Sequence, residues 1–299
     1  MAAILAMVVC MSSIIWVAAD SIYYANSCYY TYINNEKVSL KGWDSEESTV
    51  VAPTDTLNGR TLVSVASYAF YEDSVITGID FSEAKHMDII GMYAFAKSSA
   101  LTEPVVLPES ITYIGDCAFE KSSITDITFN ALVENIPIQC CYTCASLTTV
   151  TINGAQKIDS YAFASCPNLS KVTIWDTVTE IDDTAFNNDP NLKIYGFAGS
   201  CAQTYAQEHN IPFVEMVRFL LGDVDGIDGV NINDVTAIQS HLAELKTVEG
   251  IYLLAADANQ DDIVDISDAT AIQMKLADYV LPYPIGQYVT KEVVTQENN

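Results

Sequence analysis

The apolar and polar positions of this chain follow two different repeating patterns, a long one first and a short one near the C-terminus. In the long pattern, an aliphatic residue is followed, after three variable residues, by the pair Ala-Phe. One copy is degenerate, because Cys140-Cys141 replace that pair. A unit of this length cannot bury its own apolar side, so its recurrence predicts a solenoid of stacked repeats. The leading aliphatic residues recur every 22 to 25 positions, at Val65, Ile90, Ile114, Ile136, Ile158 and Ile181.

Each repeat also contains one strand-like run, for example residues 124–129, 147–152 and 169–174. Strict alternation does not place Leu169 on the same face as Val172 and Ile174. These side chains share a face only if the chain bends between them, as it does at a solenoid corner. We therefore predict a β-rich solenoid made of short strands, turns and short helices.

This repeat resembles the BspA-like leucine-rich repeats of bacterial surface antigens over about residues 60–215. Residues 195–213 are similar to the terminal strand and short capping helix of that family. The resemblance implies an N-terminal cap over residues 20–62 and repeats with their terminal cap over residues 63–215. It also implies that the Ala-Phe pairs and the strand residues are scaffold.

The short pattern is a twelve-residue acidic loop that occurs twice, at residues 223–234 and 257–268. The second copy has side-chain oxygens at loop positions 1, 3, 5, 9 and 12, a spacing suited to a hard cation such as Ca2+. Its sixth position is Asp262, where a left-handed backbone usually requires glycine. The predicted ligands are Asp257, Asn259, Asp261, Asp265, Asp268 and the main-chain carbonyl of Ile263.

The first copy departs from this spacing. Its positions 1, 3, 9 and 12 carry oxygen, but position 5 is Ile227, which has no ligand atom in its side chain. Either the loop bulges so that Asp228 coordinates, or water fills the gap and the affinity falls. We expect two Ca2+ sites, the second stronger than the first, with a metal-free acidic surface loop as the alternative. The predicted ligands here are Asp223, Asp225, Asp228, Asn231 and Asp234.

An apolar stripe after each loop predicts a helix. The stripes are Val235, Ile238, Leu242 and Leu245 after the first loop, and Ala269, Ile272, Leu276 and Tyr279 after the second. A segment this small holds no large core, so metal binding is expected to supply much of its folding free energy.

The duplicated loop and helix resemble the type I dockerins, which attach an enzyme or accessory protein to a cohesin module of a scaffoldin. The resemblance implies a small all-α calcium-binding unit at residues 216–282, followed by a loose tail at 283–299. Two similar sets of residues would contact the cohesin, which leaves binding in two orientations open. They are Ile232, Asn233, Gln239, Ser240 and Glu244, and Ile266, Ser267, Gln273, Met274 and Asp278.

The composition indicates which classes of partner and which cellular compartment to expect. The net charge is −26 with only 13 Lys and Arg, which argues against nucleic acid and anionic membranes as partners. Residues 1–19 are almost wholly apolar and end in Val17-Ala18-Ala19, which predicts a signal peptide and secretion, with a membrane span as the alternative. The eight cysteines permit disulfides, but several fall on repeat positions and are predicted to be small buried side chains instead.

The sequence contains no nucleophile elbow, metalloprotease motif or phosphate-binding loop, and its three histidines are scattered. We therefore expect a secreted, non-catalytic component of a cellulosome-like complex whose repeats bind a protein or a glycan. Tyr68, Tyr93 and Tyr161 recur at one repeat position and either line a sugar-binding surface or pack within the solenoid. The alternatives are an adhesin-type surface protein and a polysaccharide hydrolase concealed in the solenoid.

Overall fold

The computed structural model describes residues 22–25, 28–43, 49–53, 55–129 and 132–293. The chain divides into two compact units, residues 1–213 and 214–299. We describe each unit by itself. The predicted signal peptide lies outside the described residues, and none of the described helices is long and apolar enough to cross a membrane.

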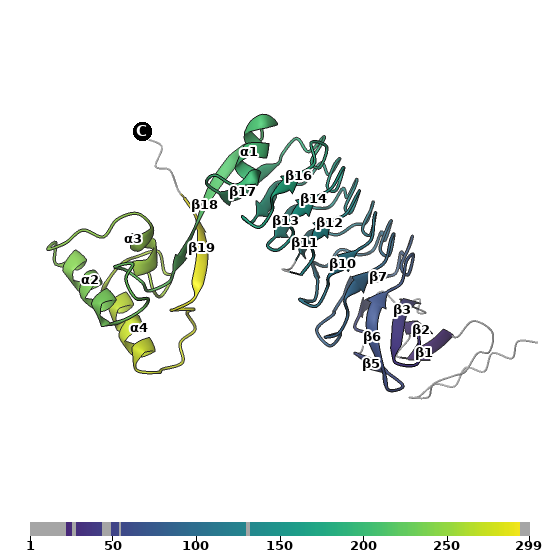
Figure 1. The fold of residues 1–299 in the computed structure, drawn as a ribbon, viewed down its shortest axis with the longest axis horizontal. Coiled ribbons are helices and arrows are strands. Elements are labelled where there is room, and N and C mark those ends of the chain that lie inside the picture. The colour runs from purple at the N-terminus through teal and green to yellow at the C-terminus, as the bar shows by residue number, and fades with distance from the viewer. Residues whose placement is uncertain (1–21, 26–27, 44–48, 54, 130–131, 294–299) are drawn as a thin grey trace, which may run out of the picture. The chain divides into compact units, whose positions relative to one another are not determined.

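The leading aliphatic residues of the repeats form a ladder of parallel strands in the first unit (Figure 1). Val65 pairs with Ile90 and Ile90 with Ile114, and further along Ile136 pairs with Ile158 and Ile158 with Ile181. These side chains are buried except for Ile181, which is half-buried. The strands are β6 (Arg60–Val65), β8 (Ile89–Ile90), β10 (Tyr113–Ile114), β12 (Asn135–Ile136), β14 (Lys157–Ile158) and β16 (Glu180–Ile181).

A second parallel ladder lies on another side of the same turns. It consists of β9 (Val105–Val106), β11 (Asp126–Phe129), β13 (Thr149–Ile152), β15 (Lys171–Ile174) and β17 (Lys193–Phe197). Leu169 precedes β15 and is fully buried, as are Val172 and Ile174 within the strand. The chain therefore bends between Leu169 and Val172, as the broken alternation required. The predicted solenoid is confirmed, with two strand ladders rather than one strand per unit.

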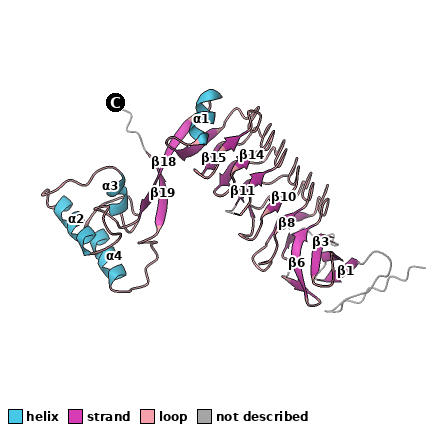
Figure 2. Cartoon of the chain, in the orientation of Figure 1, coloured by secondary structure: helices cyan, strands magenta, loops and turns pink. Residues whose placement is uncertain are grey.

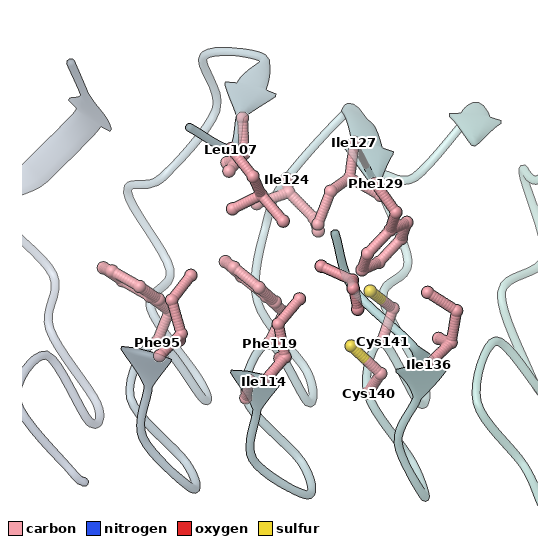
Figure 3. Close-up of a cluster of buried hydrophobic side chains, with 14 of the residues drawn as sticks. Phe95, Leu107, Ile114, Phe119, Ile124, Ile127, Phe129, Ile136, Cys140 and Cys141 are labelled. Carbon is pink, nitrogen blue, oxygen red and sulfur yellow. The ribbon is translucent and has the colours of Figure 1, made fainter. Parts of the chain in front are cut away.

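The Ala-Phe phenylalanines form a column inside the solenoid. The rings of Phe95 and Phe119 stack at 5.1 Å between centroids with an angle of 9° between their planes. In the degenerate repeat, Cys140 and Cys141 take the place of the pair, and both are fully buried. Figure 3 shows their sulfur atoms beside the aliphatic side chains of the same core, Ile136 among them. The smaller side chains keep the apolar character of the column, because a buried thiol behaves as a small hydrophobic group.

In every repeat turn except the last, where Thr184 stands, a residue with a left-handed backbone lies directly before the Ala-Phe or Cys-Cys pair. Tyr68, Tyr93 and Tyr161 occupy this position with φ of 61°, 55° and 55°. A bulky side chain is unfavourable in that region, so the turn geometry outweighs the preference of the residue. Tyr68 and Tyr93 stack at 5.1 Å between ring centroids, and the phenol ring of Tyr68 is 55% exposed.

Further elements flank the ladders at both ends of the first unit. β1 (Ile22–Ala25), β2 (Cys28–Tyr32) and β3 (Lys37–Trp43) form an antiparallel meander, and β3 pairs in parallel with β6. Helix α1 (Cys201–Glu208) contacts β16 and β17 and buries Ala202, Tyr205 and Ala206. These elements cover apolar side chains that would otherwise face water. The remaining short strands are β4 (Thr49–Val51), β5 (Thr56–Leu57) and β7 (Ile76–Ile79).

The described cysteines of the first unit are free thiols, and those on repeat positions, Cys140, Cys141, Cys144 and Cys166, are fully buried as predicted. Cys144 and Cys166 occupy the position held by Ser98 and Ser122 in earlier repeats. Each donates a hydrogen bond to a main-chain carbonyl of the preceding repeat, Cys144 to Phe119 at 3.0 Å and Cys166 to Cys141 at 3.1 Å. Ser98 does the same toward the carbonyl of Phe70 at 2.7 Å.

The described residues of the second unit form three helices and one pair of strands, and Figure 2 shows these helices in cyan and these strands in magenta. They are β18 (Phe213–Leu220), α2 (Ile232–Leu242), α3 (Ile251–Ala256), α4 (Ile266–Leu276) and β19 (Tyr288–Glu292). Helices α2 and α4 pack against each other. The all-α prediction omitted the antiparallel pairing of β18 with β19, and the prediction of a loose tail is wrong for β19. Val289 packs against the core of the unit, which gives the strand an apolar anchor.

Candidate metal centre

The twelfth residue of each acidic loop closes that loop. The Asp234 carboxylate accepts the main-chain N–H groups of Val224 and Asp225, at 2.6 and 3.0 Å, and that of Asn231 at 2.8 Å. Asp268 accepts the N–H groups of Asn259 and Asp265 in the same manner. Both carboxylates are fully buried. Each loop is therefore wrapped around a buried negative charge at its helical end.

Asp234 and Asp268 also take part in the N-terminal caps of the two helices. Asn231 is the N-cap of α2 and Asp265 is the N-cap of α4, and each forms a capping box with the aspartate three residues later. This arrangement satisfies main-chain N–H groups that the first helical turn leaves without a carbonyl partner. Loop and helix consequently form one structural element in both copies. The spacing of the predicted ligands did not reveal the capping boxes.

The main chains of the two loops share left-handed residues at positions 4 and 6, and only the first loop adds one at position 7, Gly229, with φ of 69°. The fourth position is left-handed in both, with φ of 71° at Gly226 and 60° at Gln260. The sixth position is also left-handed, with φ of 58° at Asp228 and 65° at Asp262. Aspartate is one of the few residues other than glycine that adopt this conformation readily. The first loop therefore shares two left-handed positions with the second, and its shifted Asp-Gly pair adds a third at Gly229.

In the first loop, Asp223, Asp225 and Asp234 have carboxylate oxygens within 4.8 Å of one another. Burial, and then the charge of Asp234, raise the pKa of Asp223. Asp228 is exposed and does not belong to this group, so no bulge brings its side chain to the other carboxylates. The Asn231 amide donates to the carbonyls of Gly229 and Ile227, while its oxygen caps α2. Three converging carboxylates fit a hard divalent cation such as Ca2+.

The second loop is arranged around Asp257, which is 4% exposed. Its carboxylate accepts the main-chain N–H groups of Asp261 and Asp262, at 3.0 and 3.2 Å. Ser267 donates to Asp265 and lowers the pKa of that carboxyl. Burial raises the pKa of Asp268. The side chains of Asn259 and Asp261 are joined by a hydrogen bond of 3.0 Å. All five predicted side-chain ligands belong to one loop, and their oxygens are of the type that Ca2+ prefers.

Lysine 291, on β19, contacts the second loop. Its Nζ lies 3.1 Å from Asp257 Oδ2 and 3.0 Å from Asp262 Oδ1. Burial opposes the charge of Lys291, but the hydrogen bonds to Asp262 and Asp257 outweigh it, so the pKa of the ammonium is raised. Lys291 lies in the segment that was predicted to be a loose tail, and no loop motif marks it. Only the pairing of β19 with β18 shows that this lysine reaches the loop.

The residues predicted to contact a partner lie at matching places on the two loop-helix copies. Ile232 and Ile266 occupy loop position 10, and each is 59% exposed. Glu244 and Asp278 follow the two helices with φ of 60° and 61°. Nine of the ten predicted residues are exposed, and Ser240 is half-buried; the others are Asn233, Gln239, Ser267, Gln273 and Met274.

The predicted apolar stripes bury only their first halves. Val235 and Ile238 of α2 and Ala269 and Ile272 of α4 are buried, together with Ala237 and Ala271. The predictions for Leu245 and Tyr279 are wrong, because the helices end at Leu242 and Leu276 and the chain then turns away. Leu242 and Leu276 are exposed by 41% and 42%. The second halves of the stripes therefore add to the exposed apolar area of the unit.

The first unit has a separate hollow of about 690 Å3 where its strands change partners. β7 pairs with β4 and β9 pairs with β11, and within the described ranges no strand pairing joins β7 to β9. Val50, Phe81 and Val106 contribute apolar surface to the hollow, and Lys85, Glu103 and Glu109 contribute charge. The hollow therefore combines apolar and charged side chains at an open surface of the first unit.

Comparison with known proteins identifies the repeats. The family described as BspA type Leucine rich repeat region matches residues 63–193 in six copies. These residues are therefore BspA-type leucine-rich repeats, and the match ends before the second unit. A search of curated proteins finds no match.

Among solved structures, the chain is similar to a leucine-rich repeat protein of T. pallidum, with 19% identity and a TM-score of 0.46. That likeness covers 62% of this chain and 94% of the other. A leucine-rich repeat protein from Bacteroides ovatus is 20% identical with a TM-score of 0.40, over 59% of this chain and 55% of the other.

Proposed function

We propose that the protein is a secreted, non-catalytic component of a cellulosome-like complex. In this proposal the second unit is a dockerin-like module that binds Ca2+ and then a cohesin of a scaffoldin. The leucine-rich repeats present a surface for a protein or glycan ligand. The candidate places for that ligand are the hollow beside β9 and the tyrosines before the Ala-Phe pairs, of which Tyr68 and Tyr161 are exposed.

The observation that carries the proposal is the duplication in the second unit. Two loops with left-handed fourth and sixth residues, a buried twelfth aspartate and a capping box lead into two helices that pack together. An acidic surface loop without a metal needs none of these features in duplicate. Matching exposed residues, such as Ile232 and Ile266, lie on both copies and favour one kind of partner for both.

Calcium would supply positive charge where the loops collect carboxylates. Asp223, Asp225 and Asp234 would hold it in the first loop, with Asp257, Asn259, Asp261, Asp265 and Asp268 in the second. Asp234 and Asp268 keep their hydrogen bonds to the main chain, so they position the loop as well as contributing charge. A bound cation neutralises the buried carboxylates and so stabilises the folded unit. Because the predicted cohesin-contact residues keep their places only in the folded unit, cation binding would control docking.

Retention of the full chain on a panel of immobilised cohesins, in calcium and in excess EDTA, tests the docking function. The proposal predicts that at least one cohesin retains the chain in calcium and releases it in EDTA. Failure of every cohesin to retain the chain in calcium would refute the docking function. Calorimetric titration with Ca2+, with Asp223→Ala and Asp257→Ala beside the unchanged chain, tests the loops separately. Each variant should lose one of two bound ions, and the ligand count favours the second loop as the stronger site.

Two other functions are tested by separate measurements. An adhesin-type surface protein would bind host or neighbouring cells and would not require a cohesin. The stacked tyrosines Tyr68, which is exposed, and Tyr93, which is half-buried, give an adhesin function a candidate surface. A hydrolase within the solenoid would release product from plant polysaccharides. Reproducible product release by the full chain would overturn the non-catalytic proposal.

A further inference from the structure

Lys291 is the basic side chain seen in contact with the second acidic loop in the described part of the chain. It comes from β19, where it pairs with Val217 of β18. The antiparallel register therefore fixes where the lysine stem leaves the strand. Its side chain is only 30% exposed, and the carboxylate of Asp257 is 5% exposed. The contact between them is thus largely shielded from water, which strengthens the attraction between opposite charges.

The position of this ammonium group matters because Asp257 is the first predicted ligand of the second loop. Lys291 Nζ lies 3.1 Å from Asp257 Oδ2, and the same oxygen accepts the N–H of Asp262 at 3.2 Å. Lys291 also bonds to Asp262, the sixth residue of the loop. A covalently attached cation therefore already partly neutralises the carboxylate that a divalent cation would use.

The two loops differ in this respect. The first loop gathers three carboxylates within 4.8 Å, and its described ion pairs include no lysine. The second loop contains five aspartates and the first contains four. Among the described residues, however, the carboxylates of the second loop do not converge into a group of three, as those of the first loop do. The five aspartates are Asp257, Asp261, Asp262, Asp265 and Asp268. The side chains of Leu253, Leu254 and Val264 line a cavity of about 310 Å3 together with Lys291, Asp257 and Asp262. The ammonium therefore has space in which to withdraw from the loop.

From this geometry we infer that Lys291 is an affinity-determining residue of the second cation site and acts as an attached competitor of the divalent cation. The inference rests on the proposed calcium-binding function. A positive charge beside the first ligand repels an incoming Ca2+ and reduces the attraction of Asp257. Binding of the ion and contact of Lys291 with the loop oppose each other, so by linkage calcium weakens the contact of Lys291 to the same degree.

Calcium titration of the full chain tests this inference, with Asp225→Ala in the background so that the second loop alone is measured. Lys291→Met should raise the affinity for Ca2+ roughly tenfold. Lys291→Arg, which retains the charge, should leave the affinity for Ca2+ close to that of the background chain with Lys291. Lys246→Met is the matched control, because it removes an exposed lysine of the same unit. Equal or weaker binding by Lys291→Met would overturn the inference while leaving calcium binding intact. Absence of binding in every variant would overturn the inference and the calcium-binding function together.

The accessibility of the ammonium gives a second readout that does not depend on how well the variants fold. Brief acetylation of the unchanged chain, read by peptide mass spectrometry at a temperature at which circular dichroism shows the second unit folded in both solutions, should modify Lys291 several times faster in calcium than in EDTA. Lys246 should react equally in both and serves as the internal reference. A slower or unchanged reaction of Lys291 in calcium would show that the ion does not displace it, and would contradict the inference.

Discussion

The carboxylate of Asp234 accepts the main-chain N–H of Val224 at 2.6 Å, so the last residue of the first acidic loop closes onto the second residue of the same loop. Asp268 closes the second loop onto its third residue, Asn259, as Asp234 also does onto Asp225. Both aspartates are buried and both also complete the capping box of a helix. The acidic loops are therefore parts of the fold of the second unit, and their charge has a direct effect on its stability.

Lowering the pH should stabilise the second unit when calcium is removed. Asp223 and Asp268 have pKa values raised above 3.8, so their contribution to the free energy of unfolding is complete below that pH and is lost as the pH rises through their folded values. Asp265 has a lowered pKa and acts in the opposite direction, but it is exposed.

Thermal unfolding in EDTA at a series of acidic to neutral pH values measures this effect. Asp223→Asn should make the unfolding temperature depend less on pH, since the amide does not titrate. Addition of calcium should restore stability at neutral pH, where the carboxylates are charged. An apo unit that becomes steadily more stable from pH 4 to pH 7 would contradict the expected sign.

The exposed isoleucines at loop position 10 should control docking. Ile232→Asp and Ile266→Asp each place a charge on one copy of the predicted contact face, where 59% of the side chain is exposed. If the partner binds either copy, each single variant weakens binding only a few-fold, and the double variant lowers it by at least about a hundredfold. Loss of binding in one single variant alone would show that only one orientation is used. Calcium titration of the same variants provides the control, because neither side chain is a predicted ligand.

Asp189 should make the stability of the solenoid depend on pH. Its Oδ1 accepts the N–H of Cys166 at 2.7 Å, and its Oδ2 is buried without a hydrogen bond among the described residues. Burial raises the pKa of Asp189 to about 8. The contribution of this group to stability is complete below its ordinary value of 3.8 and is lost as the pH rises through about 8.

Asp189→Asn keeps an oxygen for the Cys166 N–H and removes the charge. The variant should unfold at a higher temperature than the unchanged chain at pH 9 and show a smaller loss of stability between pH 5 and pH 9. The pKa shift of Asp189 sets an upper limit of roughly 6 kcal/mol on the stability that the unchanged chain loses through this group between low and high pH. Asp183→Asn, at a neighbouring exposed residue, is the control. Identical pH profiles for Asp189→Asn and the unchanged chain would refute the role of Asp189.

The cysteines of the solenoid should behave as hydrogen-bonding core residues. Cys144→Ser retains a donor to the Phe119 carbonyl, as Ser98 provides toward Phe70, and should change the free energy of unfolding by less than about 1 kcal/mol. Cys144→Ala removes the donor and leaves a small void, with an expected cost of about 1–2 kcal/mol. Dithiothreitol should not lower the unfolding temperature, because the described cysteines are free thiols. A large drop on reduction would contradict this assignment.

The solenoid could be predicted from the sequence because its signature lies within a few residues and recurs in every repeat. The leading aliphatic residues, such as Ile90 and Ile114, face one another across the ladder because every repeat has the same register. The loops were equally visible, since their oxygen spacing lies within twelve residues. The helix ends were not predicted correctly, because the left-handed residues Glu244 and Asp278 lie at positions where an apolar pattern still continues to Leu245 and Tyr279.

The contact of Lys291 depends on pairing between segments far apart in the chain. β19 pairs with β18 although the segment between them in the chain contains α2, α3 and α4. No periodic pattern in residues 283–293 indicates that strand, and the contact of Lys291 with Asp257 spans 34 residues. Long-range contacts of this kind require the tertiary structure, and they are where the sequence was least informative about the candidate site.

Hydrogen exchange of the full chain in calcium and in excess EDTA tests the central claim most directly. If the second unit is folded by cations, the main-chain N–H groups of residues 223–234 and 257–268, and of α2 and α4, should exchange at least tenfold faster in EDTA. The solenoid N–H groups, such as those of Val150 and Val172, should exchange at the same rate in both solutions and serve as the internal reference. Equal protection of the two loops and their helices with and without calcium would contradict the claim.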